Sequence, residues 1–264
     1  MSRITGKFTE LQAKKRKGLI VYLSAGYPDY ETTLQAVKAA EEAGADMIEL
    51  GIPFSDPMAD GPVIQKASTQ ALKAGATTGK TLELIRQIRQ QSTIPLAVMT
   101  YANVILHAGI EKFMADFSAA GLDGIIVPDV PAEESDLFDI PCKAVGLDFI
   151  HFAAPTTTPD RIQMVCQKAS GFIYCISTTG VTGVRHVDYG AIAKVITAVR
   201  QATKVPLAIG FGIGSGESAR EAAQYADAVI VGSALVQAIG EQGVEGVRSL
   251  IQSIRCGLDE QGEV

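Results

Sequence analysis

Three carboxylates lie within one short stretch of the sequence, Glu49, Asp56 and Asp60. Glu49 belongs to Met47–Leu50, an apolar run typical of a buried strand. Side chains alternate along a strand, so Glu49 shares a face with Met47, which we expect to be an apolar interior face. Desolvation there raises the pKa of a carboxyl group and lets it donate and accept a proton near neutral pH. Glu49 is therefore a candidate for proton transfer; a structural Glu paired with a Lys or Arg is the alternative.

Asp56 and Asp60 belong to the loop Gly51–Pro62, which directly follows this strand. Aspartates in turns commonly hydrogen-bond their own backbone, and Asp60 also precedes a helix that we expect from Val63. A turn or capping role is thus the alternative for each of them. Their position beside Glu49 favours chemistry, because two carboxylates in different environments can divide acid and base roles.

Glycine-rich loops form a second kind of candidate site. Gly210–Gly216 follows one apolar run, and Gly232–Ala234 follows the next run and opens a helix. Glycine lets the backbone approach a ligand closely, and helix amino termini present free N–H groups with a favourable dipole. Gly180 and Gly183 lie in a third such loop. We therefore expect these loops to bind a phosphate group; glycines that serve only tight turns are the alternative.

The elements that must position these residues repeat one pattern along the chain. A short β-branched, apolar run is followed by a loop rich in Gly, Pro and Asp, and then by an amphipathic helix. We expect strands at Leu19–Leu23, Met47–Leu50, Leu96–Met99, Gly124–Val127, Phe149–Phe152, Phe172–Ile176, Leu207–Ile209 and Ala228–Val231. We expect helices at Glu31–Ala43, Lys80–Gln90, Ile110–Ala119, Ala132–Cys142, Thr158–Lys168, Tyr189–Arg200 and Ser218–Gln224.

This alternation predicts a parallel sheet, and eight units with nearly continuous apolar strands fit a closed barrel better than an open sheet. The spacing of Ile4, Phe8 and Leu11 indicates an extra helix before the first strand, packed against the bottom or side of the barrel. No linker interrupts the pattern. We therefore predict a single (βα)8 TIM-barrel domain over residues 1–264 with an extra N-terminal helix.

In such a barrel the active site lies at the carboxyl ends of the strands. Aromatic and methionine side chains near these ends predict that part of the substrate is flat and apolar. They are Tyr22, Met99, Phe152, Tyr174 and Phe211. Two long loops at this end, Gly51–Pro62 and Ser177–Asp188, are candidate lids over the site.

The composition argues against several other classes of function. A 264-residue chain with a net charge of −6 has no overall field for nucleic acid or an anionic membrane surface. Neither the four cysteines nor the three histidines have the spacing of metal ligands or redox pairs, so no metal is expected. The apolar stretch after the basic run Lys14–Lys17 is too short to span a membrane. We expect a cytoplasmic protein, and the basic run is either a solvated helix end or an interaction patch.

One segment is specific enough to indicate a family. Glu49–Pro57 (ELGIPFSDP), with Ala59–Pro62 (ADGP) behind it, strongly resembles the signature of the tryptophan synthase alpha subunit family. Further matching segments follow in the family's order, so that the resemblance covers essentially the whole chain. They are Thr100–Asn103, Pro128–Pro131, Ala154–Thr157, Gly180–Gly183 and Gly210–Ile213.

The resemblance implies cleavage of indole-3-glycerol phosphate to indole and glyceraldehyde 3-phosphate, a retro-aldol step of tryptophan biosynthesis. It implies that Glu49 shuttles protons, that Asp60 stabilises the charge developing on the indole nitrogen, and that Tyr174 is a catalytic aromatic position near the glutamate. The implied substrate-binding residues are Tyr22, Met99, Phe152 and, in the closing loop, Thr182. The implied phosphate-binding residues are Gly183, Phe211, Gly212, Gly232 and Ser233.

The resemblance also implies a partner. Family members pair with a beta subunit that uses pyridoxal phosphate, so we expect an alpha2beta2 complex and no cofactor in this chain. The implied partner-facing positions are Pro53, Asp56, Pro57 and Asn103. The alternatives are a stand-alone indole-3-glycerol-phosphate lyase, a weakly catalytic binding subunit that activates the beta subunit and, more remotely, a sugar-phosphate isomerase barrel.

The sequence departs from the family pattern at a few positions. Tyr27 stands where the family usually has Asp, and Gly214 and Gly216 stand where Ser and Pro are expected. None of the three belongs to the carboxylate pair. The extra glycines are expected to loosen the phosphate loop, which affects affinity more than the type of reaction.

Overall fold

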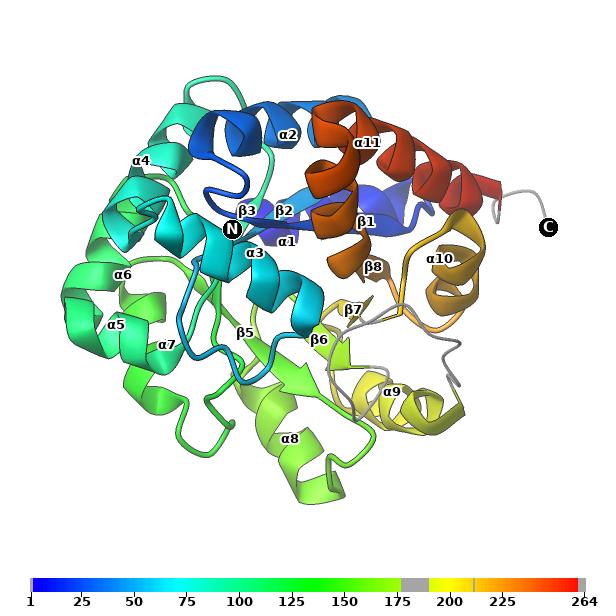
Figure 1. The fold of residues 1–264 in the computed structure, drawn as a ribbon. Helices are drawn as coiled ribbons and strands as arrows, with labels where there is room; N and C mark the ends of the chain where they lie inside the picture. Colours follow the sequence, from blue (N-terminus) through cyan, green and yellow to red (C-terminus); the bar gives the residue numbers. More distant parts are fainter. Residues whose placement is uncertain (1, 177–189, 211, 261–264) are drawn as a thin grey trace.

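The computed structural model describes residues 2–176, 190–210 and 212–260, and within them eight parallel strands close into a barrel in sequence order (Figure 1). The strands are β1 (Gly18–Ser24), β2 (Met47–Gly51), β3 (Leu96–Met99), β4 (Gly124–Ile126), β5 (Asp148–Ala153), β6 (Ile173–Ile176), β7 (Leu207–Gly210) and β8 (Ala228–Val231). Every one of them overlaps a predicted strand, and the predicted (βα)8 TIM barrel is confirmed. The strands are rich in buried aliphatic side chains, as expected for a parallel sheet covered by helices.

Helices surround the barrel and connect its strands. They are α1 (Arg3–Ala13), α2 (Tyr30–Glu42), α3 (Pro62–Lys73), α4 (Thr78–Arg89), α5 (Ala102–Ala108), α6 (Ile110–Ala119), α7 (Asp136–Ala144), α8 (Pro159–Lys168), α9 (Gly190–Ala202), α10 (Gly216–Ala223) and α11 (Ser233–Asp259). In the described part of the chain, none of them combines the length and the apolar character that crossing a membrane requires.

Two helices differ from the prediction. The seven-residue helix α5 was not predicted, because it is too short for a hydrophobic period to be recognised. Helix α7 begins at Asp136 rather than at Ala132. Residues 132–135 form turns instead, in which the Glu134 N–H donates to the Pro131 carbonyl at 3.0 Å.

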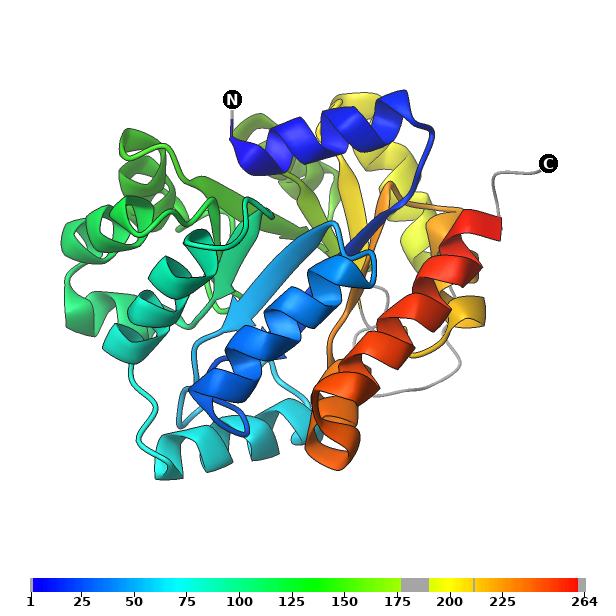
Figure 2. The same ribbon diagram turned by 90° about the horizontal axis from the view of Figure 1, so that it is seen from above.

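Helices α1 and α3 lie across opposite ends of the barrel (Figure 2). On α1, Ile4 and Phe8 are buried and join the side chains that fill the barrel interior. The Phe8 ring lies 5.9 Å from that of Phe172, measured between centroids. The extra N-terminal helix predicted from the apolar spacing therefore closes the amino-terminal end of the barrel.

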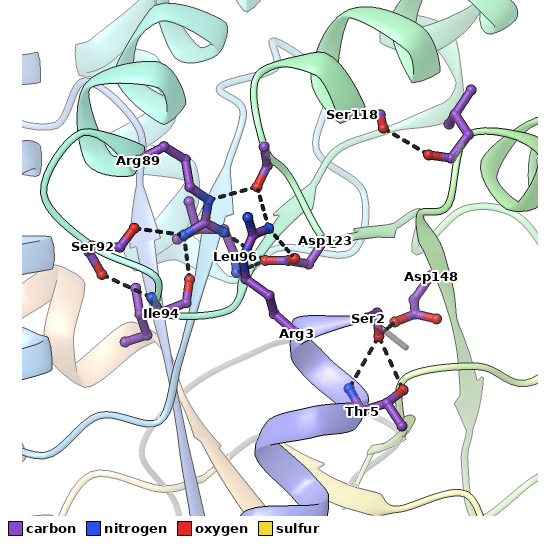
Figure 3. Close-up of polar contacts among 12 residues, drawn as sticks. Ser2, Arg3, Thr5, Arg89, Ser92, Ile94, Leu96, Ser118, Asp123 and Asp148 are labelled. Carbon is purple, nitrogen blue, oxygen red and sulfur yellow. Dashed lines mark hydrogen bonds and ion pairs between the residues drawn. The ribbon is translucent and has the colours of Figure 1, made fainter.

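Polar contacts tie α1 to the strand starts, as Figure 3 shows. Asp123 receives the Arg3 guanidinium on one carboxylate oxygen at 2.8 Å and the Arg89 guanidinium on the other at 2.7 Å. The Ser2 hydroxyl donates to the Asp148 carboxylate at 2.5 Å. Arg3 is half exposed, whereas Arg89 and Asp123 are almost completely buried. The amino-terminal end is thus closed by both apolar packing and ion pairs.

An aspartate directly precedes each of the strands β2, β4 and β8, and all three make the same bonds. Each carboxylate accepts the backbone N–H of a leucine at the start of the preceding strand, at 2.8–2.9 Å, and each aspartate N–H donates to that leucine's carbonyl. The pairs are Leu19 with Asp46, Leu96 with Asp123, and Leu207 with Asp227. Each carboxylate also forms an ion pair with an arginine of a surrounding helix. The ion pairs are Asp46 with Arg255 of α11, Asp123 with Arg89 of α4, and Asp227 with Arg200 of α9.

Candidate functional site

A cavity of about 440 Å³ lies at the carboxyl end of the barrel, where α3 and the loops after the strands meet. Its wall combines apolar strand residues with two carboxylates. The predicted site residues that line it are Tyr22, Glu49, Asp60, Met99, Phe152, Tyr174, Gly212, Gly232 and Ser233. Residues from Tyr22 to Ser233, at opposite ends of the sequence, therefore meet at one site.

Glu49 projects from β2 into this cavity, and its strand register places it opposite Tyr22 of β1. The side chain is only 1% exposed, and its Oε2 atom has no hydrogen-bond partner. Among the described residues no Lys or Arg forms an ion pair with it, so the structural alternative considered for Glu49 is not realised. Burial, and then the neighbouring Asp60, raise the pKa of Glu49 to about 8.

Asp60 reaches the same cavity from the end of the loop after β2. Its carboxyl group is 4% exposed, and its Oδ1 atom has no hydrogen-bond partner. Helix α3 starts at Pro62 with Gly61 as its N-cap residue and has no side-chain cap, so a capping role for Asp60 is not realised either. Burial raises the pKa of Asp60 to about 6, while the neighbouring Tyr101 hydroxyl opposes that rise.

The two carboxyl groups therefore differ in charge at neutral pH. With a pKa of about 8, Glu49 is mainly protonated, whereas Asp60, with a pKa of about 6, is mainly ionised. A proton donor and an anion then face the same apolar space. This is the arrangement that acid–base chemistry on a bound substrate requires.

Two tyrosines flank the carboxylates, and each lies against a glycine of the next strand. A β-carbon placed on Gly51 would lie 2.0 Å from the Tyr22 hydroxyl oxygen, and one placed on Gly210 would lie 2.4 Å from that of Tyr174. Neither ring has room unless the neighbouring residue is glycine. The Tyr174 ring also lies 5.1 Å from that of Phe152, so these rings form one aromatic side of the cavity.

The helix starts at the far side of the cavity differ in their capping. At α10, the side chains of Ser215 and Ser218 cap the first turn reciprocally. At α11 the N-cap residue is Gly232, and no side chain caps the helix. Because Gly232 and Ser233 line the cavity, the uncapped start of α11 presents its dipole and first N–H groups there. An uncapped helix start of this kind can bind an anionic group.

Several predicted site residues lie outside the residues that the structure describes. The undescribed segment 177–189 contains Thr182, Gly183 and the whole candidate lid Ser177–Asp188. Phe211 is also outside the described residues. Their assignments as substrate- and phosphate-binding residues remain predictions from the resemblance. Gly212 is described, and its φ of +79° is a left-handed conformation that favours glycine.

The residues assigned to a partner interface lie in the loop after β2 and in α5. Asp56 and Asn103 are exposed and Pro57 is half-buried, but Pro53 is buried and does not belong to the surface of the isolated chain. The exposed apolar side chains of Met58 and Leu106 lie in the same two segments. Their exposure could not be deduced from the sequence, since their neighbours along the chain give no sign of it.

Other wall residues were not predicted. Ala59, Ile64, Ile176, Ile230 and Ala234 line the cavity, as do residues of the segment 128–132. Only Ile64 carried a usable signal, because its helix α3 buries one face with a helical period.

Two departures from the family pattern are explained by packing. A β-carbon on Gly216 would lie 2.8 Å from the Ser253 carbonyl oxygen, and one on Gly257 would lie 2.3 Å from the Gly216 carbonyl oxygen, so α10 and α11 touch through two glycines. A β-carbon on Gly240 would lie 2.5 Å from the Tyr27 hydroxyl oxygen, so the larger residue at position 27 is matched by a glycine in α11. Neither contact reaches the carboxylates.

Known proteins resemble this chain over nearly its full length. Residues 8–259 match the family described as "Tryptophan synthase alpha chain". The tryptophan synthase alpha chain of Synechococcus elongatus is 45% identical over 262 residues, which cover 99% of this chain and 98% of that protein.

Solved structures of tryptophan synthase chains are similar to this chain as well. Tryptophan synthase subunit alpha from Legionella pneumophila is 35% identical with a TM-score of 0.91, covering 98% of this chain and 99% of that one. A chain of Mycobacterium tuberculosis tryptophan synthase is 37% identical with a TM-score of 0.91, covering 97% and 98%. The family indicated by the segment Glu49–Pro57 is thus confirmed, and this chain belongs to the tryptophan synthase alpha chain family.

Proposed function

We propose that the chain cleaves indole-3-glycerol phosphate to indole and glyceraldehyde 3-phosphate in tryptophan biosynthesis, as a carbon–carbon lyase of the tryptophan synthase alpha type. The observation that carries this proposal is the pair Glu49 and Asp60, which share an apolar cavity, lack counter-ions among the described residues and have separated pKa values. The family to which the chain belongs supports the substrate and the reaction.

Glu49 performs both proton transfers. In its protonated form it donates a proton to C3 of the indole ring, which leaves an iminium at the ring nitrogen. The resulting carboxylate then takes the proton of the hydroxyl on the carbon attached to C3. The carbon–carbon bond breaks as that carbon becomes an aldehyde, the electron pair returns to the ring, and Glu49 is protonated again. A pKa of about 8 suits both halves of this cycle.

Asp60 acts as the anion that the reaction needs at the ring nitrogen. Its carboxylate accepts the indole N–H and is mainly charged at neutral pH. Positive charge develops on the nitrogen during protonation at C3, and a fixed negative group in a cavity of low dielectric stabilises that charge strongly. Asp60 therefore binds the charged transition state more tightly than the neutral substrate.

The other lining residues hold the substrate in this orientation. The indole ring lies among Tyr22, Met99, Phe152 and Tyr174, and Tyr174 serves as the aromatic catalytic position near Glu49. The phosphate group lies at the start of α11, bound by Gly212, Gly232 and Ser233. From the resemblance we assign Thr182 to the closing loop, and Gly183 and Phe211 to the phosphate site.

The chain works with a tryptophan synthase beta subunit. We assign Pro53, Asp56, Pro57 and Asn103 to that contact, in an alpha2beta2 complex in the cytoplasm, with Asp56 and Asn103 at the exposed surface. The reaction proposed for this chain needs no cofactor of its own, and pyridoxal phosphate belongs to the beta subunit. Residues 1–264 act as one barrel domain.

Indole release from indole-3-glycerol phosphate tests the proposal directly. The purified chain is measured alone and then with a tryptophan synthase beta subunit, and slow release with strong activation by the partner is expected. Fast release by the chain alone would instead identify a stand-alone lyase. No release in either case, with substrate binding intact, would leave only a binding subunit that activates its partner.

A further inference from the structure

Tyr101 is a buried residue that no site assignment includes. It is 3% exposed, follows β3, and is the N-cap residue of α5. Its backbone is fixed by the start of that helix, because its carbonyl accepts the Val104 N–H at 3.0 Å. The next N–H, that of Ala102, donates to the Asp129 carboxylate at 3.0 Å. The side chain therefore extends from a rigid base.

That side chain contacts the loop after β2 at Phe54 and Ala59 and lies near Asp60. Its ring stacks on Phe54, with centroids 5.3 Å apart and an interplanar angle of 29°. Its hydroxyl oxygen accepts the N–H of Ala59 at 3.1 Å. The hydroxyl also acts on the neighbouring carboxyl group of Asp60, the residue that follows Ala59, and lowers its pKa. A hydroxyl that accepts from an amide still has its proton to donate, so it can serve both groups.

Tyr101 is buried behind the described wall of the cavity. Asp60 and Ala59 line the cavity wall, but Tyr101 does not. It lies behind them and joins the loop after β2 to the start of α5. We infer that Tyr101 is the positioning residue of this site, and that its hydroxyl orients the Asp60 carboxylate towards the indole N–H. This inference rests on the function proposed above.

The groups around Asp60 make this hydroxyl difficult to replace. Glu49 on β2, Tyr22 on β1 and Tyr174 on β6 are the described titratable groups on the strands whose charge states interact with that of Asp60. Asp129, in the loop after β4, acts on Tyr101 itself. Glu49 and Asp129 are acids, and of all these groups only Tyr101 lowers the pKa of the Asp60 carboxyl group.

The substitution Tyr101→Phe separates the hydroxyl from the ring. Phenylalanine keeps the stack on Phe54 and the packing at α5, and it removes only the hydroxyl, which accepts the Ala59 N–H and acts on Asp60. We expect kcat to fall roughly ten- to hundredfold, the effect of one hydrogen bond to a charged group. KM should stay within about twofold, because Tyr101 is not among the residues that line the cavity. The acid limb of kcat/KM should move to higher pH, since Asp60 then holds its proton more tightly.

Tyr30→Phe is the matched control. The Tyr30 hydroxyl also bonds a loop, at the Thr77 carbonyl, and lies outside the cavity, so its loss should change neither kcat nor the pH profile. The pKa of Asp60 is followed in parallel by carbon-13 NMR of the aspartate side chains, with the signal assigned from Asp60→Asn. This measurement does not depend on turnover, and the Asp60 midpoint should rise in the Tyr101→Phe protein only.

The outcomes separate the inference from the proposed function. If the wild-type chain releases no indole with or without the partner, the proposed function fails, and the NMR midpoint still decides about Tyr101. If the wild type is active and Tyr101→Phe equals it in kcat and acid limb, the positioning role is overturned. A lower kcat with an unmoved Asp60 midpoint also overturns it, because Tyr101 would then support only the shape of the loop.

Discussion

The two ends of the barrel bury carboxylates to a similar degree and surround them differently. At the amino end, Asp123 is 4% exposed and accepts bonds from Arg89, Arg3 and the Leu96 N–H. At the carboxyl end, Glu49 is 1% exposed and has no ion pair with any described residue. Burial alone therefore does not distinguish a structural carboxylate from a catalytic one, and the donors around it do.

The pKa values follow the same division. Burial raises the pKa of Asp46 at the amino end, but the Leu19 N–H and Arg255 oppose that rise. Burial raises the pKa of Glu49 as well, and there Asp60 increases the effect instead of opposing it. At the amino end, hydrogen-bond donors and arginines favour the charged form of the buried carboxylate. At the carboxyl end, the surroundings of Glu49 favour its protonated form, which keeps a proton available for transfer.

Removing the proton carrier should have the largest effect on activity. Glu49→Gln is expected to lower indole release by roughly 10²–10⁴-fold, the usual contribution of a positioned acid–base group, while the substrate still binds. Steady-state indole release and a direct binding titration measure the two quantities. Turnover at the wild-type level would remove Glu49 from the mechanism.

The same substitution should stabilise the protein at high pH. Because the pKa of folded Glu49 is raised to about 8 from an ordinary 4.5, its stability contribution is fully present below pH 4.5 and is lost as the pH rises through 8. Glutamine has no charge to bury. The free energy of unfolding of the variant should therefore rise relative to that of the wild type across that pH range, by a few kcal/mol at most, given roughly 1.4 kcal/mol per pKa unit. Urea unfolding at pH 5 and pH 9 measures this gain, and an equal difference at both values would contradict it.

Breaking the amino-terminal network should affect stability without affecting chemistry. Asp123→Ala leaves the buried Arg89 guanidinium without its carboxylate, which costs about 3–5 kcal/mol for a buried pair. Arg3→Ala is the control, because Arg3 is half exposed and its loss should cost under about 1 kcal/mol. Denaturant unfolding gives both values. Below the melting transition, kcat of either variant should equal that of the wild type, and a reduced kcat would argue against separate roles for the two ends.

The pH dependence of kcat/KM should be bell-shaped. Activity should fall about tenfold per pH unit below the Asp60 pKa of about 6, where the anion is lost, and likewise above the Glu49 pKa of about 8, where the transferable proton is lost. Because the carboxyl groups interact, the two limbs belong to the pair. Asp60→Asn should lower activity by roughly 10²-fold and flatten the acid limb. An unchanged acid limb in that variant would assign it to another group.

Phosphate binding should give the smallest effect. Inorganic phosphate at about 100 times its Kd would stabilise the chain by roughly 2.7 kcal/mol, which thermal unfolding detects as a higher Tm. Ser215→Ala serves as the control. It removes the cap of α10, so it should lower Tm with and without phosphate and leave the phosphate-induced shift unchanged. If the shift disappears in that variant, phosphate binds at α10 and not at α11.

Much of the fold could be predicted because its signals are local. Each strand is an apolar run bounded by turn residues, and the alternation along Met47–Leu50 was enough to turn Glu49 inward. The ion pairs could not be predicted, since Asp46 and Arg255 are 209 residues apart and nothing in either segment indicates the other.

The candidate site also has parts that could be predicted from the sequence and parts that could not. The segment Glu49–Pro57 and the glycine loops are recognisable by their composition, and Glu49 meets residues of both described glycine loops at the cavity. Tyr101 lies 42 residues from Ala59, and its contacts with the loop depend on α5, a helix too short to leave a periodic pattern. The contact of Gly216 with Gly257 likewise depends on how α10 crosses α11.

The aspartates that precede β2, β4 and β8 have a consequence for how this protein can evolve. Asp46, Asp123 and Asp227 each join two neighbouring strand starts by two bonds, so the stagger of three strand pairs, β1 with β2, β3 with β4 and β7 with β8, is fixed at the end remote from the cavity. The described loops at the other end take no part in these three connections. Insertions, deletions and exchanges in those loops can therefore accumulate over generations without breaking them, which lets a lineage change its ligands while it keeps its scaffold.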